Sequence, residues 1–313
     1  MSPPSAQVDV SRTAGIRQAA RVTSLRVAVL GPGGVGGLLA VLLARQGSAV
    51  TCLARPETAA HLDRAGLELS SDRFGELTAA VRGATALDEP VDVLLVTPKA
   101  THLDDALDRV PADVLGDAVV VPLLNGVEHM AVLRERYPAA RVVAGTIRVV
   151  AHRPAPGRIR HEGRAPAVQL TPGAERLAEA LADAGVDVRV RPDEAGLLWD
   201  KLCFLAPLAL LTTATMGPVG RVREERGADL TAVIDEVAAV ARAEGAAPDP
   251  AATHASAESL PEGMGSSMLR DAEEGNPIEL DGIGGAVLRA AERHGLDVPV
   301  TRRIVEELRA RSR

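Results

Sequence analysis

The spacing of hydrophobic positions changes once along the chain. Between residue 25 and about residue 150, short apolar runs alternate with turns and helical stretches. Residues 38–47 predict a helix that ends at a glycine. The runs that we expect to form buried strands cover residues 25–30, 48–55, 91–99, 118–126 and 141–150. Alternating strands and helices are typical of βαβ units, so this half predicts a parallel sheet in an α/β domain.

After about Arg191 the apolar positions recur at helical spacing. The segments that predict helices cover residues 194–215, 227–244, 265–274 and 277–294. Residues 241–263 are rich in alanine and proline and predict a helix end followed by a surface connection. We therefore expect an α/β domain over residues 25–191 and an all-helical domain over residues 192–313. Residues 1–24 lack the hydrophobic centre of a secretory signal and predict a disordered extension, with a transit peptide left open.

Composition narrows the class of protein. The net charge of −7 argues against a nucleic-acid binder. Apolar runs fall short of the length that spans a bilayer, so no membrane partner is expected. Cys52 and Cys203 lie in apolar runs without metal-ligand spacing. We expect them to be buried, reduced thiols in a cytoplasmic protein that holds no metal.

A glycine-rich turn follows the first expected strand. Gly31, Gly33 and Gly36 stand in G-x-G-x-x-G register within VAVLGPGGVGG, with Gly34 and Val35 between them. The first glycine permits a tight turn, the second lets the backbone approach a pyrophosphate, and the third allows close helix–strand packing. The helix that follows offers free N–H groups to phosphates. These five residues predict a Rossmann-type dinucleotide site; a glycine-rich turn that binds another ligand is the alternative.

The end of the second expected strand distinguishes the two nicotinamide dinucleotides. Arg55 stands there, where an NAD site usually has an acidic residue for the ribose 2′-hydroxyl. An arginine suits the 2′-phosphate of NADPH, because its guanidinium forms charge-assisted, bidentate hydrogen bonds. We therefore predict NADPH as the cofactor. Glu57 leaves an NAD site open.

The chain has 35 basic residues, of which only Lys99 and Lys201 are lysines. Lys201 interrupts the apolar segment LLWDKLCFLAPLALL. Lysine can lose its proton when it is desolvated, which arginine does not, so Lys201 is a candidate acid. Lys99 and Asn125 end two successive strands, where parallel sheets bind ligands. The alternatives are a lysine that covers apolar surface, a solvated strand end and a simple Asn-Gly turn.

These segments, in this order, resemble the ketopantoate reductase (2-dehydropantoate 2-reductase) family. The resemblance runs from about Leu25 to the C-terminus. The segments that carry it are GPGGVGG, LAR, VTPKA, LLNGVEHM, VVAGTIRVVAHRPAPGRIRH, LLWDKL, GSSMLRDAEEGNPIELDGIGG and ERHGLDVPVT. It implies a Rossmann domain and a helical domain around an active-site cleft. It also implies NADPH-dependent reduction of a 2-oxo acid to a 2-hydroxy acid, in pantothenate biosynthesis.

The resemblance also implies roles for individual residues. Lys201 corresponds to the family's general acid, which protonates the ketone oxygen as hydride arrives. Lys99 and Asn125 correspond to cleft residues that contact cofactor and substrate.

Three further residues match family positions. Ala151 corresponds to a backbone contact with the cofactor. Ser267 corresponds to the contact with the substrate carboxylate, and Glu279 to the acid that reaches the cofactor when the domains close.

The chain departs from the family pattern at the substrate positions. The family typically has asparagines four and eight residues after the lysine, where this chain has Leu205 and Ala209. A further family asparagine aligns with Val219. Because a buried amide that reads a substrate hydroxyl confers large selectivity, we expect a substrate other than ketopantoate. Pro207 is expected to kink this helix and to re-aim the residues that follow.

Two classes of function stay open. The first is an active reductase for a small 2-oxo acid, and the second is a non-catalytic NADP(H)-binding sensor of the same fold. A β-hydroxyacid dehydrogenase has a similar domain plan, but its typical motifs are not found in the chain. A homodimer is left open.

Overall fold

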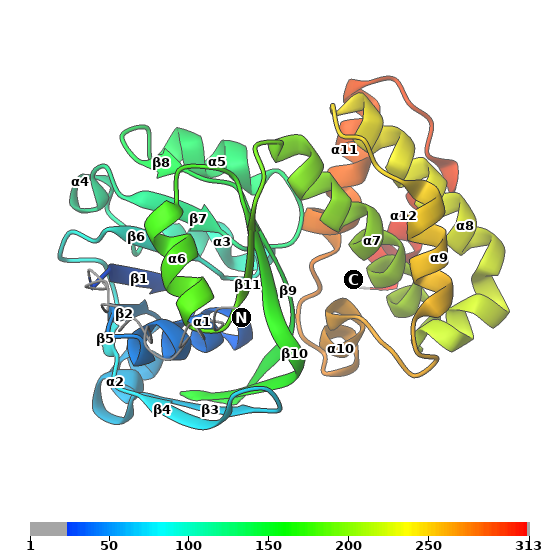
Figure 1. The fold of residues 1–313 in the computed structure, drawn as a ribbon. Helices are drawn as coiled ribbons and strands as arrows, with labels where there is room; N and C mark the ends of the chain where they lie inside the picture. The colour runs from blue at the N-terminus through cyan, green and yellow to red at the C-terminus, as the bar shows by residue number, and fades with distance from the viewer. Residues whose placement is uncertain (1–23, 312–313) are drawn as a thin grey trace, which may run out of the picture.

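The computed structural model describes residues 24–311 (Figure 1). The expected N-terminal extension, together with the alternative of a transit peptide, falls on residues 1–23. Both therefore lie outside the described residues and stay predictions.

A six-stranded sheet in which all neighbouring strands are parallel forms the centre of the N-terminal half. Its strands are β1 (Arg26–Leu30), β2 (Ala49–Leu53), β5 (Arg82–Ala84), β6 (Val93–Val96), β7 (Val119–Pro122) and β8 (Arg141–Val142). They lie in the order β5-β2-β1-β6-β7-β8. Counted along the chain within this sheet, that is the 3-2-1-4-5-6 order of the doubly wound dinucleotide-binding fold. The predicted fold class is confirmed.

Both faces of this sheet are covered. Alternate residues of β1 enter two separate hydrophobic cores, with Val27 and Val29 in one and Ala28 and Leu30 in the other. This double burial explains why the strands are nearly continuous apolar runs. The helices of this half are α1 (Gly34–Arg45), α2 (Pro56–Ala65), α3 (Leu103–Leu107), α4 (Ala112–Leu115), α5 (His129–Arg136) and α6 (Glu175–Asp183). The 3-10 turn η1 (Ala100–His102) follows β6.

A second, mixed sheet packs over α1, and it was not predicted from the sequence. Its strands are β3 (Leu67–Ser71), β4 (Gly75–Ala79), β9 (Gly145–Ala155), β10 (Arg158–Leu170) and β11 (Asp187–Val190). The prediction that residues 141–150 continue the parallel sheet was wrong beyond Val142, because β9 leaves that sheet and pairs antiparallel with β10. Figure 1 shows β9 and β10 crossing between the parallel sheet and the helical half. Apolar periodicity identifies a strand but not its pairing partner.

The C-terminal half is helical, as predicted, and encloses its own hydrophobic core. Its elements are α7 (Glu194–Thr215), α8 (Val219–Ala243), α9 (Pro250–Ser259), α10 (Ser267–Glu273), the π-helical turn η2 (Asp281–Gly285), α11 (Ala286–Arg293) and α12 (Pro299–Arg311). Helix α12 was not predicted from the sequence. The domain boundary at 191/192 falls in the loop between β11 and α7 and stays a prediction.

Residues 241–263 contain a helix that the sequence analysis took for a surface connection. Asp249 caps α9 by accepting a hydrogen bond from the backbone N–H of Ala252 at 2.9 Å, and Pro250 occupies the first helical position. An aspartate cap followed by proline is a favourable start for a helix. The cap signal therefore outweighs the proline content that suggested a loop.

Helix α7 runs unbroken from Glu194 to Thr215, although Pro207 lies inside it. Asp193 caps its N-terminus through the N–H of Gly196. Contrary to the expectation from the sequence, α7 is long and apolar enough to cross a membrane by length and composition alone. Most of its apolar window is buried within the protein, however, and core packing accounts for that character.

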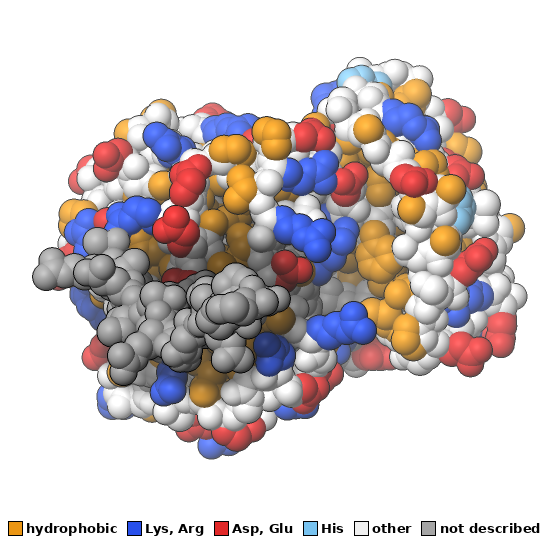
Figure 2. All heavy atoms as spheres, in the orientation of Figure 1, with side chains coloured by type: hydrophobic (Ala, Val, Ile, Leu, Met, Phe, Trp, Pro, Cys, Tyr) orange, Lys and Arg blue, Asp and Glu red, His pale blue; other side chains and the backbone are white. Residues whose placement is uncertain are grey.

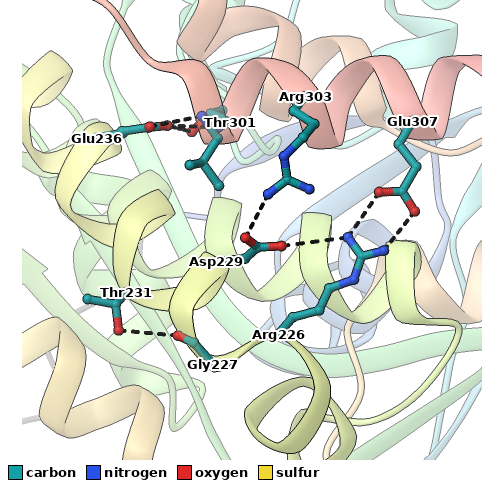
Figure 3. A network of polar contacts seen from close by, with 9 residues as sticks. Arg226, Gly227, Asp229, Thr231, Glu236, Thr301, Arg303 and Glu307 are labelled. Carbon is teal, nitrogen blue, oxygen red and sulfur yellow. Dashed lines mark hydrogen bonds and ion pairs between the residues drawn. The ribbon is translucent and has the colours of Figure 1, made fainter.

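A polar network ties α8 to α12 in the helical half (Figure 3). Arg226 leaves helical geometry within α8 and donates two hydrogen bonds, at 2.8 and 2.9 Å, to the carboxylate of Glu307. Glu236 accepts three hydrogen bonds at the start of α12, from the N–H of Val300 and from the N–H and hydroxyl of Thr301. Thr301 has no exposed surface. Glu236 is thus the acceptor for donors that water does not reach.

We expect Glu236→Ala to lower the free energy of unfolding by about 2 kcal/mol, because the buried donors of Thr301 lose their acceptor. Urea unfolding followed by circular dichroism measures the change. Glu306→Ala is the matched control on α12, since Glu306 is exposed and has no polar partner among residues 24–311. It should change stability by no more than about 0.5 kcal/mol. An equal decrease in the free energy of unfolding in both variants would contradict the assigned role of Glu236.

Candidate active site

In the N-terminal half, the residues that we predicted to bind ligands meet at one edge of the parallel sheet. Arg55 follows β2, the glycine turn follows β1, Lys99 follows β6 and Asn125 follows β7. These four strands are adjacent in the sheet, in that order. Their carboxyl ends therefore place the four features side by side, across the point where the strand order reverses from β1 to β6. Ligands bind at this point in doubly wound sheets.

The backbone of the glycine turn has the properties that its spacing predicted. Gly31 has a φ of +81°, and a Cβ there would lie 2.9 Å from the backbone N of Pro98. A Cβ on Gly36 would lie 2.3 Å from the hydroxyl oxygen of Thr97. That hydroxyl donates to the carbonyls of Leu30 and Gly31, at 2.9 Å each, and so pins the turn to the end of β6. Thr97 lies within VTPKA, and no local pattern in the sequence indicates this role.

The residues present fit a dinucleotide phosphate. A Cβ on Gly33 would meet nothing closer than 4.0 Å, so the space in front of the turn is open. Gly33 is the N-cap of α1 and has no side chain to occupy the first N–H groups, and the first turn carries no acidic residue. Those N–H groups and the helix dipole favour an anion. Behind the turn, a Cβ on Gly34 would lie 2.3 Å from the carbonyl oxygen of Ala151. The backbone of Ala151 therefore packs directly against the glycine turn, and its contact with the cofactor stays a prediction.

Arg55 stands at the exposed end of β2 and begins α2 as its N-cap. Its guanidinium has no hydrogen-bonding or ionic partner among residues 24–311. Glu57 is likewise exposed and unpaired within the described part of the chain. The geometry leaves both side chains available to a ribose.

The helical half contributes to the same edge of the sheet. Lys201, on α7, donates from Nζ to the carbonyl oxygen of Leu124 at 3.1 Å. The buried carboxylate of Glu279 accepts hydrogen bonds from the N–H of Ala100 at 3.0 Å and from Nδ2 of Asn125 at 2.9 Å. The structure therefore brings Lys201 and Glu279 to the loops that follow β6 and β7.

Glycines let the two halves approach closely at this point. Gly126 has a φ of +87°, and a Cβ there would lie 2.3 Å from the carbonyl oxygen of Gly282 in η2. The sequence analysis raised Asn125-Gly126 only as a turn alternative. The structure shows that this glycine is also required by the contact between the halves.

The surroundings of Lys201 lower the pKa of its ammonium group to about 8. Desolvation is the largest cause; the negative charge of Glu279 opposes it, and the positive charge of Arg148 adds to it. His129 is also buried, and burial together with the charge of Lys201 lowers the pKa of its imidazole to about 3. His129 is therefore neutral beside the lysine, a feature that the sequence analysis missed.

Lys99 forms an ion pair across the two halves. Its Nζ lies 2.6 Å from Oδ1 of Asp271, whose side chain is nearly buried on α10. Asp271 was not assigned a role from the sequence, although it belongs to the segment GSSMLRDAEEGNPIELDGIGG that supports the resemblance. The pairing means that the charge of Lys99 is already compensated in this arrangement.

The remaining predicted residues differ in exposure. Ser267 is exposed at the first turn of α10, whereas its neighbour Ser266 is buried, caps that helix and bonds the hydroxyl of Thr212. Leu205 is partly buried against the helical core. Ala209 has no exposed surface and Val219 only 2%. In this structure the last two residues pack into the protein rather than line an open surface.

Both cysteines are buried and free, as predicted, and burial raises the pKa of each thiol to about 12. Neither lies among the residues that meet at the sheet edge.

Comparison with known proteins agrees with the fold and identifies the family. Residues 27–173 match the family model "Ketopantoate reductase PanE/ApbA", and residues 195–312 match its C-terminal counterpart. A 2-dehydropantoate 2-reductase of Mycobacterium tuberculosis (strain ATCC 25618 / H37Rv) is 32% identical over 293 residues, which cover 91% of this chain and 97% of that protein.

Solved structures have the same fold. A PanE/ApbA family ketopantoate reductase from Ralstonia eutropha JMP134 superposes with a TM-score of 0.82 at 29% identity, over 91% of this chain and 98% of that one. D-mandelate dehydrogenase in complex with NADH and anilino(oxo)acetate superposes with a TM-score of 0.83 at 21% identity, over 92% and 98% of the two chains. The second likeness concerns the fold alone.

The glycine turn, the strand order and the lysine helix thus define a two-domain, dinucleotide-dependent oxidoreductase. The chain belongs to the ketopantoate reductase family, and it is an enzyme that uses a nicotinamide cofactor.

We expect the protein to bind NADPH more tightly than NADH, because Arg55 is free to pair with a 2′-phosphate. Arg55→Ala should weaken NADPH binding about 10- to 100-fold, the scale of hydrogen bonds to a charged group, and leave NADH binding nearly unchanged. Fluorescence titration of both dinucleotides measures this. Arg64→Ala, on the exposed side of α2, is the control. Equal affinities in the parent protein, or a preference that survives Arg55→Ala, would contradict the assignment.

Proposed function

We propose that this protein reduces a 2-oxo acid to the 2-hydroxy acid with NADPH. The observation that carries the proposal is the position of Lys201. Its ammonium group is desolvated, has a pKa lowered to about 8, and is held at the carboxyl edge of the sheet that also carries the glycine turn. A poised acid beside a dinucleotide site is what the reduction of a ketone requires.

The chain's own residues supply positioning, charge and a proton. The nicotinamide, when bound, supplies the hydride. Lys201 donates its Nζ proton to the ketone oxygen, and its positive charge stabilises the negative charge that develops there. Glu279 lies near enough for its carboxylate to favour the protonated form of Lys201. The hydrogen bond to Leu124 fixes the direction of the ammonium group.

In this proposal the residues of the dinucleotide site bind different parts of NADPH, and the preference for NADPH over NADH depends on Arg55. Gly31, Gly33, Gly34, Val35 and Gly36 would hold the diphosphate, and Arg55 would pair with the 2′-phosphate. Ala151 contributes its backbone, since it backs the glycine turn at Gly34. Asn125 and Lys99 border the nicotinamide end from the loops after β7 and β6.

The substrate is a 2-oxo acid with an apolar tail. Leu205 occupies the position, one turn after the lysine, where the family typically has an asparagine. Ser267 remains available as an exposed hydroxyl for the carboxylate. The relative from Mycobacterium tuberculosis is a 2-dehydropantoate 2-reductase, and 2-dehydropantoate therefore stays a candidate substrate. Ala209 is a weaker candidate for a substrate contact than Leu205, because it is fully buried.

One observation also favours a second function, that of a non-catalytic NADP(H)-binding sensor. The burial of apolar residues at Ala209 and Val219, with no amide at either position, also suits a protein that binds NADP(H) without turning over a substrate. The lowered pKa of Lys201 favours the enzyme over this sensor, because a cofactor sensor has no need of a poised acid. The expected cytoplasmic location, a homodimer, and the absence of nucleic-acid and membrane partners stay predictions.

We expect Lys201→Ala to lower kcat by at least about 100-fold, the low end for loss of a general acid. Lys201→Arg should not restore it, since a guanidinium holds its proton. NADPH consumption at 340 nm with a panel of 2-oxo acids measures kcat, and NADPH titration checks that both variants still bind the cofactor. A near-normal kcat in Lys201→Ala would refute the role.

The same role predicts a pH dependence. The acid must be protonated, so kcat/KM should be constant below the pKa of Lys201 and should fall as the pH rises through about 8. A pH profile of the parent enzyme from 6 to about 10 tests this. Activity that rises through this range would contradict an acid with this pKa.

We expect 2-oxoisovalerate and 2-oxoisocaproate to be better substrates than ketopantoate, because Leu205 replaces an amide that would read a hydroxyl. The preference should be modest, roughly 10- to 200-fold, because an apolar pocket rejects an added hydroxyl only weakly. Leu205→Asn should raise kcat/KM for ketopantoate, with Leu205→Ile as the volume-matched control. If ketopantoate is preferred by orders of magnitude and Leu205→Asn does not raise kcat/KM for ketopantoate, the hypothesis of a substrate with an apolar tail is wrong.

A further inference from the structure

Strand β9 presents two different faces. Its odd-numbered residues Ile147, Val149 and Ala151 pack into the core that the mixed sheet forms with α1. Side chains alternate along a strand, so Arg148 and Val150 lie on the opposite face. Both are exposed. An arginine therefore stands on the side of β9 that faces away from α1.

Arg148 lies close enough to Lys201 for the two charges to interact. Helix α7, which carries Lys201, packs against β9. The charge of Arg148 contributes to the environment of the Lys201 ammonium group, which places the two cations within electrostatic reach of each other. Glu279 supplies one negative charge near Lys201, but no carboxylate within residues 24–311 pairs with Arg148, so the arginine can take a further anion.

Arg148 is free to take that anion. Its guanidinium has no hydrogen-bonding or ionic partner anywhere in residues 24–311. Lys99, the other cation that the family resemblance places in contact with the substrate, is already paired with Asp271 at 2.6 Å. Ser267 can offer a hydroxyl but no charge. The site therefore has one uncompensated fixed cation close to the proton donor.

A 2-oxo acid matches this arrangement. Its ketone carbon is bonded directly to its carboxylate, so a proton donor for the ketone and a cation for the carboxylate must lie near each other. A guanidinium presents two parallel N–H groups that fit the two oxygens of a carboxylate. We propose that Arg148 binds the carboxylate of the substrate and thereby orients the ketone toward Lys201. This inference rests on the proposed function and names a residue that no part of the sequence analysis had selected.

The test compares charged and uncharged ligands in the full-length protein with NADPH present. Arg148→Gln should raise KM for 2-oxoisocaproate, and Kd for its unreactive analogue N-isopropyloxamate by calorimetry, about 10- to 100-fold. Arg148→Lys should recover part of the loss. The primary amide of the same analogue, which has no carboxylate, should bind the parent and Arg148→Gln equally. Arg302→Gln on α12, which also removes one exposed, unpaired cation, should behave as the parent.

The outcomes separate the inference from the proposed function. If the parent reduces 2-oxo acids and Arg148→Gln keeps the parent's KM and Kd, Arg148 does not bind the carboxylate, although the function stands. If Arg148→Gln weakens NADPH binding instead, the arginine serves the cofactor and the inference is overturned. If the parent reduces none of the 2-oxo acids, the proposed function fails, and the Kd for N-isopropyloxamate alone decides the role of Arg148. A parent that neither reduces nor binds these acids overturns both.

Discussion

The buried carboxylate of Glu279 is the interaction on which the arrangement of the two halves depends. A charged group that is only 6% exposed is costly unless hydrogen bonds compensate for lost water. Both of its donors, the N–H of Ala100 and the amide of Asn125, belong to the sheet-bearing half. The helical half therefore satisfies this carboxylate only by docking at the carboxyl edge of the parallel sheet. Gly126 and Gly282 allow the backbone contact that this docking needs.

The same docking sets the electrostatics of Lys201. Desolvation disfavours the ammonium form, and the charge of Glu279 favours it; the net effect lowers the pKa to about 8, so desolvation is the stronger of the two. The ion pair between Lys99 and Asp271 crosses the same boundary, but the Lys99 side chain is 41% exposed. Solvent screens such a pair, and pairs of this kind contribute about 0–1 kcal/mol. The buried carboxylate, rather than the exposed ion pair, therefore holds the two halves in register.

At the proposed substrate site the chain keeps the family's lysine, but the residues around it differ from the family pattern. Lys201, Ser267 on α10 and Glu279 just before η2 are the residue types that the family resemblance assigns to the site, whereas Leu205 stands where the family typically has an amide. An apolar side chain at that position removes a hydrogen bond that would select a hydroxylated substrate, but it leaves the chemistry at the ketone untouched. In the proposed function, selectivity and catalysis therefore depend on different residues of one helix.

The sequence by itself determined the elements whose signal is local. The G-x-G-x-x-G spacing requires a tight turn, an open approach and close packing at three fixed positions, and the structure has all three. The apolar runs of the parallel strands and the helical spacing after Arg191 are equally local patterns. Lys201 could be selected because a lysine within an apolar helix is conspicuous in the sequence alone.

Only the tertiary structure decided what depends on pairing between distant segments. The mixed sheet, the departure of β9 from the parallel sheet and the pairing of Lys99 with Asp271 follow from contacts between residues far apart in the chain, which no local pattern encodes. Arg148 illustrates the point. In sequence it is one arginine among many, because its significance lies in the face of β9 that it occupies and in the lysine of another domain that this face approaches. Alternation along a strand shows which residues share a face, but the tertiary packing decides what that face meets.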